Sequence, residues 1–165
     1  MPRRRNAARL LFLLWGVALG NQAVWAAQVQ LAVISAPTAP RLSFDRDTLR
    51  NVYLKRIFVD SDGVKLTPVN LPADSPLRDA FTKSVLHMAE RPMQDYWDKQ
   101  YFQGVSPPYV LASDEAVIRF AAATPGAVGY VASCHADTSV RVVMLVPLPP
   151  TISETSLCSD RTATP

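Results

Sequence analysis

Apolar runs rich in β-branched residues alternate along this chain with segments whose apolar residues recur three or four positions apart. The first pattern predicts a buried strand, and the second predicts a helix with one apolar face. The expected strands cover residues 28–34, 65–70, 109–112, 128–132 and 140–146. Because strands and helices alternate, we expect an α/β fold, with a mostly parallel sheet flanked by helices.

Local start signals mark the expected helices between these strands. Ser75 can cap a helix whose first position is Pro76, because a serine hydroxyl accepts a backbone N–H and proline has none to leave unpaired. Ser113 is expected to open the last helix in the same way. Further starts are expected at Ser43 or Asp45 and at Arg91.

The first residues predict export. Arginines at positions 3, 4, 5 and 9 precede an uncharged apolar run at 10–19, and mostly small or apolar residues follow at 23–27. This order is typical of a secretory signal peptide, and the apolar run is shorter than the ~20 residues that a membrane span needs. We expect cleavage after Ala26, with Ala27 as the second choice. The alternative is an uncleaved N-terminal anchor.

Export divides the chain into three expected parts. Residues 1–26 are the signal peptide, residues 27–147 a single domain, and residues 148–165, rich in Pro, Ser and Thr, a flexible tail. The mature protein is expected in the periplasm or otherwise secreted, without stable membrane insertion after cleavage. An envelope protein is therefore one possible class of partner.

Signal cleavage also removes the positive charge of the chain. The whole sequence has 17 Lys and Arg residues against 14 Asp and Glu residues. Four of the basic residues and none of the acidic ones lie in the first 26 positions, which leaves 13 basic against 14 acidic residues. Because the mature chain is not basic, we expect no nucleic-acid partner.

The two cysteines, Cys134 and Cys158, both lie in the mature part. An oxidising compartment permits a disulfide between them, and two free thiols are the alternative. Because structural zinc sites usually combine four cysteine and histidine ligands, these two cysteines make a poor site. His135 beside Cys134 and His87 are both interpreted as structural. We expect no metal and no cofactor.

Several short stretches occur in an order that points to one family. They are LAVI at 31–34, LSFDRDTLRNVYLKRIF at 42–58, DG at 62–63, PVN at 68–70, SPLRDAF at 75–81, YW at 96–97, FQG at 102–104, PP at 107–108 and PGAVGYV at 125–131. Together they resemble the phosphate-binding proteins of ABC transporters, members of the type 2 periplasmic binding protein superfamily. The resemblance implies an α/β lobe that binds a solute without covalent chemistry.

Two departures from that family matter. Its members hold the anion between two lobes, whereas the matching stretch at about 29–132 resembles one lobe, chiefly the second. Its members also use an Arg-x-Asp-Gly-Ser-Gly-Thr loop before the anion-facing helix. At the corresponding positions 70–78 only Ser75 matches that motif, and Asp74 brings a charge that repels phosphate.

The resemblance and the helix starts together mark Asn70, Ser75, Arg78 and Ser113 as candidate ligand-binding residues. A helix N-terminus presents unpaired N–H groups and a partial positive charge, which suits phosphate or another small oxyanion. The plain alternative is two ordinary capped helices with Arg78 in solvent. The alternative function is a ligand-free interaction module that docks on an envelope sensor, transporter or secretion partner. No catalytic constellation is present, so we expect no enzyme.

Four aromatic residues lie close together at Tyr96, Trp97, Tyr101 and Phe102. We expect Trp97 and Phe102 to pack against the sheet, because large aromatic side chains are usually buried. A platform for a sugar or a peptide is the alternative. Asp60 to Gly63 is expected to form a turn.

Overall fold

The computed structural model describes residues 30–38, 44–149 and 157–158. The elements, in chain order, are β1 (Gln30–Ser35), α1 (Arg46–Tyr53), β2 (Thr67–Asn70), α2 (Pro76–Phe81), η1 (Thr82–Leu86), α3 (Glu90–Tyr101), β3 (Tyr109–Val110), α4 (Asp114–Ala123), β4 (Ala127–Ala132) and β5 (Arg141–Pro147). The expected signal peptide and most of the expected tail lie outside the described residues. No helix in the described part is long and apolar enough to cross a membrane.

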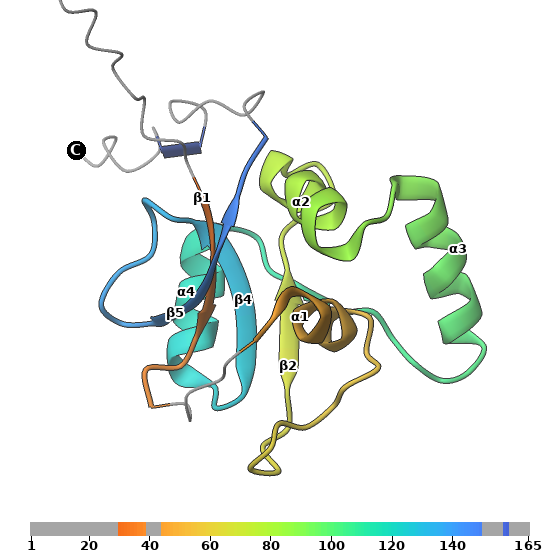
Figure 1. Cartoon of the computed structure of the whole chain (residues 1–165), viewed down its shortest axis with the longest axis horizontal. Coiled ribbons are helices and arrows are strands. Elements are labelled where there is room, and N and C mark those ends of the chain that lie inside the picture. The colour runs from red at the N-terminus through yellow and green to blue at the C-terminus, as the bar shows by residue number, and fades with distance from the viewer. Residues whose placement is uncertain (1–29, 39–43, 150–156, 159–165) are drawn as a thin grey trace, which may run out of the picture.

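The strands form one five-stranded sheet in the order β3-β2-β4-β1-β5. β2 pairs in parallel with β3 and β4, while β1 pairs antiparallel with β4 and β5 (Figure 1). Four strands therefore point one way and β1 runs against them. The α/β fold is confirmed, but a mostly parallel sheet is only partly right. The sequence pattern does not reveal that β1 inserts between two strands that come much later in the chain.

Helices cover both faces of this sheet. On one face α4 packs closely on β4: a Cβ atom added at Gly129 would lie 2.5 Å from the Cγ1 atom of Val117. Side chains of successive strand residues point to opposite faces, so the next residue, Tyr130, points to the other face. There its ring stacks on Phe81 with centroids 4.1 Å apart, and Tyr53 lies 5.9 Å away.

The helix starts follow the expected local chemistry. Asp45, Ser75 and Ser113 are the N-caps of α1, α2 and α4, and each side chain accepts a backbone N–H of the first turn. α2 continues into η1, a π-helical turn that ends at His87 in the left-handed conformation, with φ of 52°. The turn at Asp60 is also confirmed: its Oδ1 accepts the N–H groups of residues 62 and 64.

The expected packing of Trp97 and Phe102 against the sheet is wrong. α3 has no buried residue, Phe102 is 88% exposed and Tyr101 is 70% exposed. Figure 1 shows α3 standing at the outer side of the molecule, beyond α2 and away from the strands. Tyr96 ties α3 to the end of α1: it donates a hydrogen bond to the Leu54 carbonyl at 2.6 Å, and the Arg56 guanidinium lies 5.5 Å from the centre of its ring. Met93 is partly buried against the core.

Candidate functional site

Ser75 lies where the chain passes from β2 into α2, at the edge of a pocket. Its side chain is half-buried, and its Oγ accepts the backbone N–H of Arg78 at 3.4 Å. Pro76 occupies the start of the helix. The serine hydroxyl keeps its own proton for donation, because capping uses only the oxygen as an acceptor. The cap of α2 therefore does not use the hydroxyl proton of Ser75.

Ser113 caps α4 at the other side of the same pocket. Its Oγ accepts the backbone N–H of Ala116 at 3.2 Å. Asp114 and Glu115 follow in the first turn, where carboxylates interact favourably with the positive end of the helix dipole. The structure thus brings the starts of α2 and α4 together, although 38 positions separate the two serines in the sequence.

The pocket has a volume of about 460 Å³. Its described wall combines two hydroxyls, three carboxylates, one imidazole and several apolar side chains. The lining residues are Leu71, Pro72, Asp74, Ser75, Pro76, Leu77, Ala112, Ser113, Asp114, Glu115, His135 and Leu157. None of these twelve residues is a lysine or an arginine, so the groups in the pocket wall that can attract an anion are those of the two helix starts.

Arg78 and Asn70 are placed outside this pocket. The Arg78 guanidinium turns back and donates from Nη1 to the Leu71 carbonyl at 2.8 Å. It lines a neighbouring hollow of about 330 Å³ between α2 and α3, together with Trp97. Asn70 ends β2, and its Oδ1 accepts the Tyr130 hydroxyl at 2.7 Å. Burial raises the pKa of the Tyr130 phenol, so this hydroxyl remains a donor.

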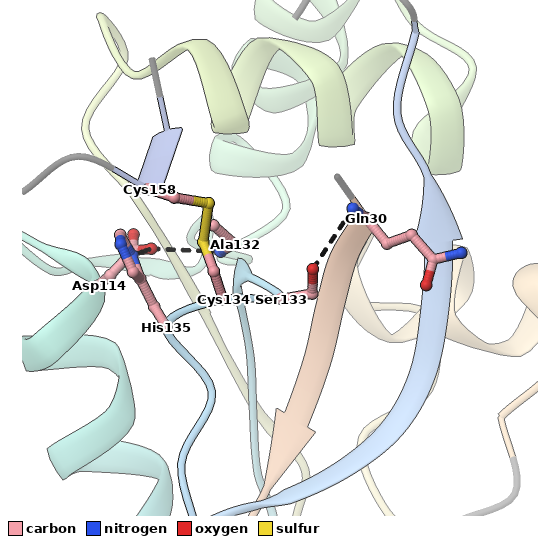
Figure 2. The surroundings of a disulfide bond; sticks show 7 residues. All are labelled: Gln30, Asp114, Ala132, Ser133, Cys134, His135 and Cys158. Carbon is pink, nitrogen blue, oxygen red and sulfur yellow. Dashed lines mark hydrogen bonds and ion pairs between the residues drawn. A yellow bond between two sulfur atoms is a disulfide. The ribbon is translucent and has the colours of Figure 1, made fainter. Parts of the chain in front are cut away.

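Asp114 and His135 form a polar pair that sequence reasoning did not connect. The Asp114 Oδ2 lies 2.7 Å from His135 Nδ1 and also accepts the backbone N–H of Ala132 at 3.2 Å (Figure 2). His135 is only 6% exposed. The two side chains are 21 positions apart, and the pair depends on the β4 end lying against the start of α4. The only local signal was a histidine next to a cysteine.

A disulfide joins Cys134 to Cys158, so neither cysteine is free. The bond brings Leu157 and Cys158 from the C-terminal part of the chain against the core. Leu148, just after β5, is also buried. Among the described residues, no group of three or more histidine, cysteine, aspartate or glutamate side chains is arranged to hold a metal ion.

No family model matches this chain, and no curated protein matches it in sequence. Several solved structures resemble it in fold, including the following three. An ABC-type phosphate transport receptor from Vibrio cholerae is 20% identical, with a TM-score of 0.57 over 71% of this chain and 46% of its own. A phosphate ABC transporter substrate-binding protein with bound phosphate, from Clostridium perfringens, is 16% identical, with a TM-score of 0.58 over 70% and 45%. PstS from Borrelia burgdorferi is 14% identical, with a TM-score of 0.54 over 83% and 54%.

These likenesses define the class of fold: the chain is built like part of a transporter solute-binding protein. More particularly, the matched part of the fold is shared with phosphate ABC transporter substrate-binding proteins, as the resemblance in sequence implied. The chain spans about half the length of the structures that it matches.

Proposed function

We propose that this chain is an extracytoplasmic solute-binding protein, and that it holds phosphate or a similar small oxyanion in the pocket between Ser75 and Ser113. The observation that carries the proposal is the meeting of two capped helix starts in one pocket. The fold likeness to phosphate-transport binding proteins supports it. The export signal expected in the first 26 residues supports a location outside the cytoplasm.

The two helix starts supply the attraction. Backbone N–H groups in a first turn point out of the helix and carry part of its dipole, so they bind oxyanions without a lysine or an arginine. Ser75 and Ser113 add hydroxyl donors at the rim of the pocket. Binding of this kind involves no covalent step, so the proposed function is not enzymatic.

The carboxylates restrict which anion fits. Asp74, Asp114 and Glu115 line the pocket and repel a fully ionised ligand. Asp114 already accepts hydrogen bonds from His135 and from the Ala132 backbone, which disperses its charge. A carboxylate accepts a hydrogen bond from an oxyanion only when that oxyanion carries a proton. The pocket is therefore expected to prefer hydrogen phosphate over sulfate, which has no proton at neutral pH.

The pocket also limits affinity. Small-molecule sites usually bury 70–90% or more of their ligand, whereas about half of each matched structure lies outside the match to this chain. We propose that a further wall comes from another part of the protein or from a partner, and that the described domain alone binds in the millimolar to high micromolar range.

Calorimetry tests the proposal. The exported protein is titrated with phosphate and with sulfate at neutral pH, beside a Ser75→Ala/Ser113→Ala variant. The control is Ser61→Ala, which removes a hydroxyl from the exposed turn before β2. We expect heat with phosphate in the unmodified protein and in the control, and none in the double variant. No heat in the unmodified protein at millimolar phosphate would contradict the oxyanion proposal.

A second candidate function is the interaction module, and a specific observation favours it. Large apolar side chains are exposed on α3 and on the edge strand β3: Tyr101, Phe102, Tyr109 and Val110 are each more than half exposed. Exposed aromatic groups are common at protein interfaces. Replacing Phe102 and Tyr109 with alanine should then abolish recovery of an envelope partner in a pull-down, while the Ser75→Ala/Ser113→Ala variant retains it.

A further inference from the structure

The disulfide lies beside the candidate pocket, and no sequence motif connects its two cysteines with ligand binding. His135 is the chain neighbour of Cys134, and Leu157 is the chain neighbour of Cys158. Both of these neighbours line the pocket. Figure 2 shows the bridge next to the pair of Asp114 and His135. Each half of the disulfide therefore carries an adjacent side chain into the pocket wall.

The Cys134 half of the bridge is anchored by the sheet. The backbone N–H of Ser133 donates to the Gln30 carbonyl at 2.8 Å, and the N–H of Gln30 lies 3.4 Å from Ser133 Oγ. On the other side of Cys134, the N–H of His135 donates to the Ala132 carbonyl at 2.9 Å. These backbone bonds tie the residues on both sides of Cys134 to β1 and to the end of β4.

The Cys158 half arrives from a distant part of the chain. Leu157 and Cys158 are partly buried against the core, and 24 positions separate the two cysteines. Leu157 contributes an apolar surface to a pocket whose other described parts include three carboxylates and two hydroxyls. An apolar side chain at this position excludes water, and a lower local dielectric strengthens the attraction between an anion and the helix starts.

We propose that the disulfide builds one wall of the ligand pocket by holding Leu157 in the same pocket as the helix starts at Ser75 and Ser113. Leu157 then covers the bound ligand, and the disulfide holds Leu157 in position. This inference rests on the proposed function, because it treats the pocket as the site of binding. Affinity therefore depends on a residue far from both helices in the sequence.

Two variants and one control test the wall by phosphate calorimetry. Leu157→Ala keeps the bridge and removes the apolar side chain, and Cys134→Ser/Cys158→Ser releases the segment. The control is Leu145→Ala, which truncates a half-exposed leucine on β5 that does not line the pocket. We expect phosphate affinity to fall about tenfold in both test variants, and to stay within about twofold in the control. Unchanged affinity in Leu157→Ala would overturn the inference.

Nuclear magnetic resonance separates this inference from the proposed function. The chain has two histidines: His135 lies in the pocket, and His87 is exposed at the end of η1. If the unmodified protein gives no heat with phosphate, the oxyanion proposal fails. The place of Leu157 in the pocket wall is then tested by the histidine ring signals alone. In Leu157→Ala the His135 signals should move while those of His87 stay. A His135 ring that is unaffected by the loss of Leu157 would contradict the wall.

Discussion

α4 and α3 are helices of similar length that lie in different surroundings. α4 buries Val117, Ile118 and Ala121 against β4, whereas the longer α3 buries none of its residues. α2 resembles α4, because it buries Leu77, Ala80 and Phe81. These core-facing helices differ from the rim helix α3 in burial. Apolar periodicity therefore predicts that a helix forms, but it does not predict whether that helix packs in the core. The candidate pocket lies between the two core-facing helices, whose starts the core holds in place.

Two phenylalanines give the largest expected difference between these regions. Phe81 is fully buried and stacked on Tyr130, while Phe102 at the end of α3 is 88% exposed. Phe81→Ala should lower the free energy of unfolding by about 3–5 kcal/mol, because it leaves a cavity. Phe102→Ala should change it by less than about 0.5 kcal/mol. Urea denaturation measures both, and similar losses would remove the distinction between core and rim.

Two glycines sharpen the same comparison. Gly129→Ala places a methyl group against Val117 on α4 and should cost up to about 3 kcal/mol by overpacking. Gly104→Ala, after α3, has nothing within 4 Å and should cost only the strain of its positive φ, about 1 kcal/mol. In a Val117→Ala background, the additional cost of Gly129→Ala should be smaller, and the cost of Gly104→Ala should be unchanged. Thermal unfolding distinguishes these outcomes, and equal behaviour of the two glycines would contradict close packing by α4.

Helix caps give the smallest expected effects. Ser113→Ala removes the cap of α4 and should cost about 1 kcal/mol. α3 begins at Ala89, which has the extended backbone of an N-cap but no side-chain hydrogen bond. Ala89→Ser should therefore stabilise the protein by up to about 1 kcal/mol. Chemical denaturation of the two variants should show opposite signs. A loss of stability in Ala89→Ser would mean that the start of α3 is held by something other than its cap.

Local chemistry explains what could be predicted from the sequence. Ser75, Pro76 and Ser113 signal helix starts through their own hydrogen-bonding properties, and each lies where those signals place it. Asp60 and Gly63 signal a turn in the same way. The direction of a strand is different, because it depends on distant partners: β1 pairs with residues about one hundred positions later.

The same reason limits prediction of the site. The sequence marked Ser75 and Ser113 separately, but their meeting in one pocket depends on how β2 and β4 bring α2 and α4 together. The direction of Arg78 is decided by the Leu71 carbonyl, which accepts its guanidinium. His135, Asp114 and Leu157 come from three segments that are close only in the fold.

The most direct measurement of the central claim is a phosphate titration followed on the backbone amides of the exported protein. We expect the largest chemical-shift changes in the first turns of α2 and α4, at Leu77, Asp114 and Glu115. The N–H groups of Arg78 and Ala116 already donate to the capping serines and should change less. The signals of α3 should stay in place. Changes centred on α3, or no change at either helix start up to millimolar phosphate, would contradict the account.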